Sequence, residues 1–155
     1  MIYNFGAQLV KGEAAERELD THFSEWFAIR RATRAEQRSG IDRVFTRKRD
    51  GKITRVEYKA DWKASQTGNA FVEIISVDTT NKLGWALSSN ADRLAYYLPT
   101  DSLVYWFAMA GFKSLVDGWR RDYDQRAALN EGYKTIGILV PLHELEEHAD
   151  NVLNI

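Results

Sequence analysis

Residues 41–60 read IDRVFTRKRDGKITRVEYKA, and this stretch decides the fold because it predicts a β-hairpin. Two segments of mixed apolar and polar residues flank Asp50-Gly51. Asp-Gly between such segments is the strongest short-range hairpin signal in a sequence. If Asp50 and Gly51 are the two loop residues, Arg49 faces Lys52 and the pairing continues outward from there. This register assigns each residue of the stretch to a partner and to a face of the sheet.

The predicted register brings three charged side chains to one face of the hairpin. Asp42 lies opposite Lys59, and Val44 lies opposite Glu57. Directly opposed residues share a face, as do residues two apart along a strand, so Asp42, Glu57 and Lys59 converge near one end. The other face receives apolar residues suited to a core, namely Ile41, Phe45, Val56 and Tyr58. Two carboxylates and an ammonium form a potential divalent-metal site, whereas an ordinary surface pair of Asp42 with Lys59 is the simpler alternative.

Composition predicts a single globular domain over residues 1–155. Hydrophobic residues make up 45% of the chain and charged residues 28%, which is ordinary for a folded domain. Cysteine is absent, which excludes disulfides and thiolate metal sites. No apolar run is as long as a membrane span and no signal peptide is evident, so we expect an intracellular, cytoplasmic protein with no membrane partner.

Charge is concentrated in one segment although the formal net charge is only −1. Residues 30–63 hold twelve Lys or Arg against five Asp or Glu. Such a basic segment in a near-neutral chain is typical of a nucleic-acid contact surface, and a solvated hairpin with long side chains is the alternative. The segment contains the carboxylate cluster, so its cations would hold phosphates where a metal could act on them.

Hydrophobic periodicity predicts a mixed α/β (α+β) fold with a central, mainly antiparallel mixed sheet flanked by helices. Helices are expected at 12–26, at 110–128 and after Pro141, with a polar loop at 34–40. Strands are expected at 28–33, 41–48, 53–60, 70–76, 94–98, 103–108 and 133–140.

The first predicted helix carries an acidic residue that points inward. At about 100° per residue, Glu16 lies on the same side as Phe23 and Phe27, and Asp20 lies on the flank one turn later. An inward carboxylate needs a partner, because burying it alone is costly. A salt bridge to a sheet arginine and a place beside the metal both provide one.

The order of helix carboxylate, strand Asp and Glu-x-Lys on the next strand resembles the PD-(D/E)XK nuclease superfamily. Residues 12–19, GEAAEREL, are similar to the opening helix of its archaeal-type Holliday junction resolvases. Residues 40–42 (GID), 56–59 (VEYK), 67–73 (TGNAFVE) and the 84–92 segment are similar to uncharacterised phage-type and mobile-element members. Ile41 stands where the superfamily's name has proline.

This resemblance implies a restriction-endonuclease-like core and an Mg²⁺-dependent deoxyribonuclease, most simply an endonuclease, for which Mn²⁺ could substitute. It assigns Asp42 and Glu57 to the metal, with the backbone carbonyl of Tyr58 as a further oxygen ligand. Lys59 would position or help deprotonate the attacking water, and Glu16 would be the helix acid of the site. Additional site candidates are Asp20, Gln66 and Glu73. Nucleic-acid contacts are expected at Arg43, Arg47, Lys63, Thr67 and Asn69.

Other interpretations stay open. A non-catalytic nucleic-acid-binding or assembly module could keep the same fold, and RNA could replace DNA as the substrate. Cutting both strands of a duplex would favour a homodimer. His143 and His148 resemble a zinc-protease helix, but they are five residues apart and point to different faces, so shared zinc binding is not expected.

Overall fold

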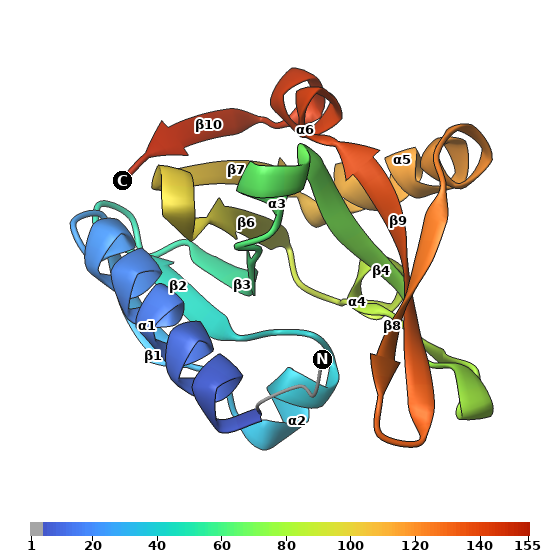
Figure 1. The fold of residues 1–155 in the computed structure, drawn as a ribbon. Coiled ribbons are helices and arrows are strands. Elements are labelled where there is room, and N and C mark those ends of the chain that lie inside the picture. Colours follow the sequence, from blue (N-terminus) through green and yellow to red (C-terminus); the bar gives the residue numbers. More distant parts are fainter. Residues whose placement is uncertain (1–4) are drawn as a thin grey trace.

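The computed structural model describes residues 5–155, which form a mixed α/β fold and confirm the predicted fold class (Figure 1). In these residues the larger sheet has six strands, antiparallel throughout except for the parallel pair β3 and β6. In sheet order they are β1 (Phe27–Arg31), β2 (Arg43–Arg47), β3 (Ile53–Ala60), β6 (Arg93–Leu98), β7 (Leu103–Ala108) and β10 (Asn151–Asn154).

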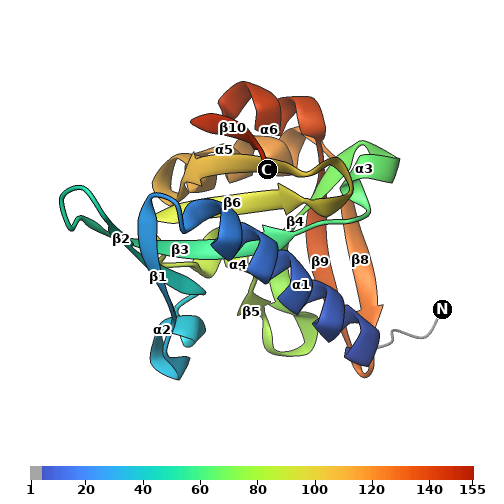
Figure 2. The same cartoon turned by 90° about the vertical axis from the view of Figure 1, so that its left-hand side faces the viewer.

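A smaller antiparallel sheet of four strands forms from two separate parts of the described chain (Figure 2). In sheet order it contains β5 (Lys82–Leu83), β4 (Asn69–Val77), β9 (Tyr133–Pro141) and β8 (Gln125–Asn130). Strands β4 and β5 belong to the connection between β3 and β6. The chain therefore leaves the large sheet after β3, forms two strands of the small sheet, and returns to the large sheet beside β3; the other two strands of the small sheet come after β7.

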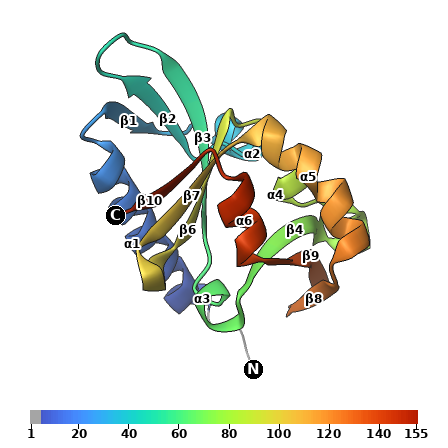
Figure 3. The same cartoon turned by 90° about the horizontal axis from the view of Figure 1, so that it is seen from above.

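Helices cover both faces of the large sheet, with α1 on one face and the small sheet, α5 and α6 on the other (Figure 3). The helices are α1 (Phe5–Phe23), α2 (Arg34–Arg38), α3 (Ala64–Thr67), α4 (Trp85–Ser88), α5 (Met109–Asp122) and α6 (Leu142–His148), with short 3₁₀ turns at Asp78–Thr80 and Pro99–Asp101. Within residues 5–155, no helix combines the length and apolar character needed to cross a membrane.

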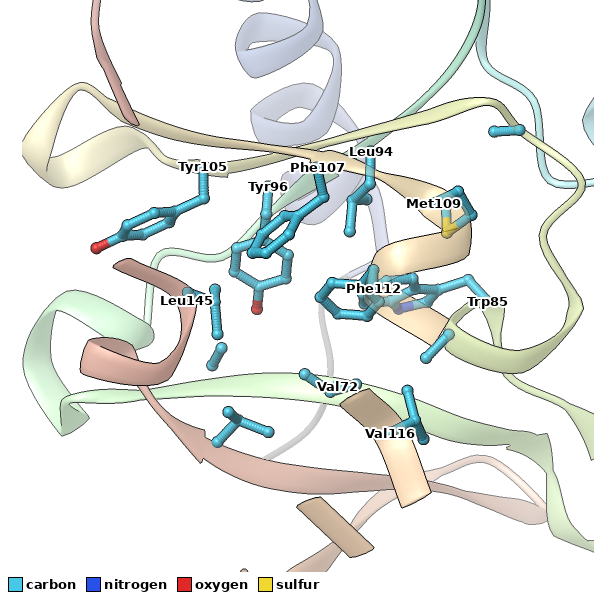
Figure 4. Packing of buried hydrophobic residues seen from close by; sticks show 14 of the residues in the cluster. Val72, Trp85, Leu94, Tyr96, Tyr105, Phe107, Met109, Phe112, Val116 and Leu145 are labelled. Atoms are coloured by element: carbon cyan, nitrogen blue, oxygen red, sulfur yellow. The ribbon is translucent and has the colours of Figure 1, made fainter. Parts of the chain in front are cut away.

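Two hydrophobic clusters fill the two sides of the large sheet. On one side, Leu19 and Phe23 of α1 pack on Phe45, Val56 and neighbouring sheet residues. On the other side, the large sheet packs against β4, α4, α5 and α6; Figure 4 shows side chains of this cluster, among them Tyr96, Val72, Trp85, Phe112 and Leu145. Close packing on both faces explains why β3 and β6 carry so many fully buried residues.

The hairpin has a longer loop than predicted, so the predicted register is wrong by two residues. Val44 faces Arg55 instead of Glu57, and the Arg47 N–H donates to the Lys52 carbonyl at 2.8 Å. The loop therefore consists of residues 48–51. Asp50 explains this length, because its carboxylate accepts hydrogen bonds from the Arg47 guanidinium and the Lys52 N–H, while Gly51 takes the left-handed conformation with φ of 75°.

The two-residue shift keeps the side chains of the paired strand residues on their predicted faces, because faces alternate with a period of two. Phe45, Val56 and Tyr58 lie in the α1 cluster, as expected. Ile41 instead joins the cluster on the other face, since it lies before β2 begins.

Several predicted boundaries also change. The polar loop expected at 34–40 contains α2, which begins with a capping box between Thr33 and Glu36. Helix α1 begins at Phe5 and ends at Phe23, and α5 ends at Asp122 so that β8 can start at Gln125. Strand β10, which the hydrophobic pattern did not indicate, forms the last edge of the large sheet.

Candidate active site

Asp42 is held at the start of β2 by the backbone of β3. Its N–H donates to the Val56 carbonyl at 2.9 Å, and its Oδ2 accepts the Tyr58 N–H at 2.8 Å. The side chain of Asp42 thus replaces a backbone acceptor at the end of the ladder. This bond fixes the carboxylate beside the two residues that flank Tyr58, namely Glu57 and Lys59.

Glu57 and Lys59 form an ion pair on the face of β3 that carries the Asp42 carboxylate. The Lys59 Nζ lies 3.1 Å from Glu57 Oε1. The charges of Glu57 and Asp42 raise the pKa of Lys59 above its ordinary value, even though burial lowers it. Lys59 also packs over the ring of Trp85 at 5.6 Å from its centroid. These contacts keep Lys59 protonated at neutral pH.

Glu57 is the least satisfied polar residue of this site. Only 3% of the residue is exposed, and its Oε2 has no hydrogen-bond partner among the described residues. Burial raises the pKa of Glu57, and the charge of Lys59 and the nearby Ser89 hydroxyl offset this only in part. The Ser89 hydroxyl donates its hydrogen bond to the Gly40 carbonyl at 2.8 Å, so it does not partner Oε2. A buried carboxylate oxygen without a partner is costly, and native structures keep few of them. A bound cation would supply the missing partner.

Glu73 approaches the same cluster from β4 of the small sheet. Burial raises its pKa, and the nearby charge of Lys59 lowers it in part. Gly84 packs so closely on Glu73 that an added Cβ would lie 2.4 Å from the Glu73 carbonyl oxygen. This close approach requires glycine and sets Trp85 of α4 next to Lys59. The site therefore lies where the two sheets meet.

Glu16 and Asp20 belong to α1, which covers the opposite face of the large sheet. Arg43 donates to Glu16 at 3.2 Å and to Asp20 at 3.0 Å, and the Tyr58 hydroxyl donates to Asp20 at 2.9 Å. Of the two partners expected for an inward Glu16, the structure has the sheet arginine. Neither carboxylate points at the pair of Asp42 and Glu57.

The predicted nucleic-acid contacts divide into exposed and engaged residues. Arg43 is only 4% exposed, and each of its three guanidinium nitrogens already donates a hydrogen bond within the protein, so this placement does not favour the expected phosphate contact. Arg47 is paired with Asp50 in the hairpin loop. The remaining candidates, Lys63, the additional site candidate Gln66, Thr67 and Asn69, lie on or beside α3. There Thr67 and Asn69 hydrogen-bond each other around a left-handed Gly68. The first three of these candidates are exposed at the surface.

Two exposed arginines that the sequence did not single out lie on α2, which ends four residues before Asp42. Arg34 and Arg38 are one helical turn apart on α2, and neither has an ion pair within residues 5–155. The Thr33-x-x-Glu36 capping box is the signal that could have identified this helix and the shared face of its arginines.

A second group of ligand-type side chains lies on α6. Among the described residues, Glu144, Glu147 and His148 form the one group of three such ligands within 4.8 Å of one another. Glu144 already accepts hydrogen bonds from Trp119 and Tyr123. The other two side chains are exposed, which is common for acidic groups that bind no ion. The Asp42 site instead offers two carboxylates, and Mg²⁺ commonly uses few protein ligands and keeps several waters.

No protein-family model, curated protein or solved structure matches this chain. The interpretation of the site therefore depends on its own geometry and chemistry.

Proposed function

We propose that this protein is a metal-dependent nuclease that hydrolyses phosphodiester bonds of DNA as an endonuclease. The observation that carries the proposal is the buried Oε2 of Glu57, which has no hydrogen-bond partner within the described residues. The other oxygen of this carboxylate, Oε1, pairs with Lys59, and Asp42 is held on the same face by the N–H of Tyr58. Carboxylate oxygens suit a hard divalent cation, and a lysine held charged next to them suits an anionic substrate. The resemblance to PD-(D/E)XK nucleases supports the same assignment.

Asp42 and Glu57 would hold Mg²⁺, or Mn²⁺ in its place, because they are the two carboxylates on this face of β2 and β3 and Oε2 of Glu57 lacks a partner. When bound, the ion would lower the pKa of a water and offset the charge on the phosphate. Lys59 keeps its proton beside the two carboxylates, so its role is to orient the water and stabilise charge on the phosphoryl oxygens. Glu73, with its raised pKa, is the group placed to take up a proton near Lys59.

The DNA contact surface that we propose is formed by exposed cations on α2 and on the hairpin loop. Arg34 and Arg38 lie on one face of α2, with side chains about 6 Å apart at their bases. Glu36 between them is already paired with Arg30. Arg49 and Lys52 are exposed in the hairpin that projects from the body of the protein (Figure 2). Since only residues 39–41 separate α2 from Asp42, we expect phosphates bound on α2 to approach the metal ligands.

Cleavage of plasmid, branched DNA and RNA in the presence of Mg²⁺ or Mn²⁺ tests this function. We expect wild type and Lys134→Ala to cut DNA and the Asp42→Ala and Lys59→Ala variants to be inactive. Lys134 is a matched control because it is an exposed lysine of β9, in the small sheet. Equal activity in all four proteins would reject the site. Binding of DNA by wild type without cleavage of any substrate would favour the non-catalytic module. Preferential cleavage of RNA would mean that the substrate is RNA and not DNA.

The oligomeric state is part of the same proposal. A single chain offers one such site, and cutting both strands of a duplex would favour a homodimer on DNA. Mass measurement of the protein with and without a duplex tests this point, and a monomer on cleaved duplex would show that each strand is cut separately.

A further inference from the structure

Asp20 joins two residues of the large sheet from the α1 side. Its carboxylate accepts the Arg43 Nε–H at 3.0 and 3.2 Å and the Tyr58 hydroxyl at 2.9 Å. Arg43 also lies over the Tyr58 ring, with its Cζ 5.3 Å from the ring centroid. Both residues are almost fully buried, at 4% and 6% exposed. Asp20 therefore ties β2 to β3 through partly buried, charge-assisted contacts.

Arg43 and Tyr58 also hold Asp42, whose side chain lies on the other face of the sheet from Asp20. Arg43 Nη1 donates to the Asp42 carbonyl at 3.0 Å, and the Tyr58 N–H donates to the Asp42 carboxylate at 2.8 Å. One bond fixes the main chain of Asp42 and the other fixes its side chain. Both donors belong to residues whose side chains end on Asp20.

We propose that Asp20 is a positioning residue, which sets the place and orientation of the Asp42 carboxylate through Arg43 and Tyr58. This inference rests on the proposed function, because it concerns the metal affinity of that same site. It gives Asp20 a role different from a metal ligand, since its oxygens face Arg43 and Tyr58 on the opposite side of the sheet. Partners that orient a metal ligand commonly change metal affinity by about 10- to 100-fold when they are removed.

The chain provides a matched control for the contact of Tyr58 with Asp20. Tyr97 of β6 also reaches α1, where its hydroxyl donates to Glu18. Tyr97 belongs to the same hydrophobic cluster as Tyr58, but no hydrogen bond links it to Asp42 within residues 5–155. Tyr58→Phe and Tyr97→Phe thus each remove one bond between α1 and the sheet, and only the first touches a residue that holds Asp42.

The test measures Mn²⁺ affinity by titration calorimetry without nucleic acid, together with the melting temperature of each variant. We expect Tyr58→Phe to weaken Mn²⁺ binding by about 10-fold, and Asp20→Asn by at least as much. Tyr97→Phe should leave Mn²⁺ binding within about twofold of wild type while lowering the melting temperature to a similar extent. If Asp20→Asn fails to fold because Arg43 loses its main partner, the two tyrosine variants decide the result.

The outcomes separate this inference from the proposed function. Mn²⁺ binding that depends on Asp42 but is equal in Tyr58→Phe and Tyr97→Phe overturns the positioning role and leaves the metal site intact. Mn²⁺ binding that Asp42→Ala does not weaken overturns the proposed site and, with it, this inference. Weaker binding in Tyr58→Phe alone supports both.

Discussion

The strands β2 and β3 carry a charged cluster on each face, and the two clusters differ in how fully their polar atoms are partnered. Under α1, the guanidinium of Arg43 and the carboxylate of Asp20 each make several hydrogen bonds. On the other face, Oε2 of Glu57 has no partner among the described residues. A saturated cluster holds the strands together, whereas an unsaturated one is suited to bind something. This contrast is why we propose a structural role for one face and the proposed chemistry for the other.

Changing one glutamate to glutamine on each face gives the largest expected difference, which is in the rate of DNA cleavage. Glu57→Gln removes a proposed metal ligand, and we expect kcat for DNA cleavage to fall by about 10²- to 10³-fold. Glu16→Gln keeps an oxygen that can still accept from Arg43, so we expect less than about a fivefold loss. Steady-state cleavage of a labelled duplex measures both. An equal loss in the two variants would break the contrast and return Glu16 to the metal site.

Removing one cation from each face should affect stability in the opposite order. Arg43→Met leaves Glu16 and Asp20 without their shared partner, and we expect unfolding to become easier by about 2–3 kcal/mol. This is below the range for fully buried pairs, because the two carboxylates are about a third exposed. Lys59→Met should cost about 1 kcal/mol, since Glu57 can accept a proton in its place. Urea denaturation of the two variants measures the difference, and a larger cost for Lys59→Met would reverse the assignment of structure to the α1 face.

The pH dependence of stability should distinguish the face that carries Glu57 from the face that packs on α1. Because the pKa of Glu57 is raised in the folded protein, its contribution to stability is complete below the ordinary value of 4.5 and is lost as the pH rises through the folded-state value. Mn²⁺ binds the ionised form, so it should restore stability at higher pH. At a hundred times its Kd, we expect a gain of about 2.7 kcal/mol at pH 7.5 and a smaller gain at pH 5.

Thermal melting from pH 5 to pH 8, with and without Mn²⁺, measures this effect. Glu57→Gln is the control, since it has no proton to lose at this position. It should lose the Glu57 part of the slope, while the raised pKa of Glu73 keeps its own part, and it should lose the metal response. A gain from Mn²⁺ that does not change with pH, or that survives in Glu57→Gln, would place the ion elsewhere.

Alternation along the strands could be predicted from the sequence, and the partners across the molecule could not. Asp42, Glu57 and Lys59 share a face as expected, because a register error of two residues does not change faces. The loop length was missed because Asp-Gly indicates where a chain turns, whereas the bonds of Asp50 decide how wide the turn is. Alternation also places Arg43 on the face opposite Asp42. An arginine on a core face needs a carboxylate, and this was the available signal that Glu16 and Asp20 belong to Arg43.

The arrival of Glu73 and Trp85 at the site could not be predicted in the same way. Both residues lie near Lys59 because the chain leaves the large sheet after β3 and its next strand, β4, pairs with β9. The β9 partners of β4 come more than sixty positions later in the chain. Local patterns carry no information on such long-range pairing. The same limit explains why the small sheet itself was not separated from the large one.

The smallest expected effect is on DNA binding and concerns the arginines of α2. It compares the surface beside the proposed site with a surface on the small sheet. If Arg34 and Arg38 each contact a phosphate, replacing both with alanine should weaken duplex binding and lower the slope of log K against log salt by about 1.8. Arg126 and Lys134, exposed on the β8–β9 hairpin, provide a control with the same loss of charge. Their replacement should change the affinity slightly through net charge and leave the slope unaltered. Fluorescence anisotropy over a salt series, without metal so that no DNA is cut, measures both slopes. Equal slopes for the two double variants would mean that α2 acts only through long-range charge, and the contact surface would then have to lie on the α3 side of the site.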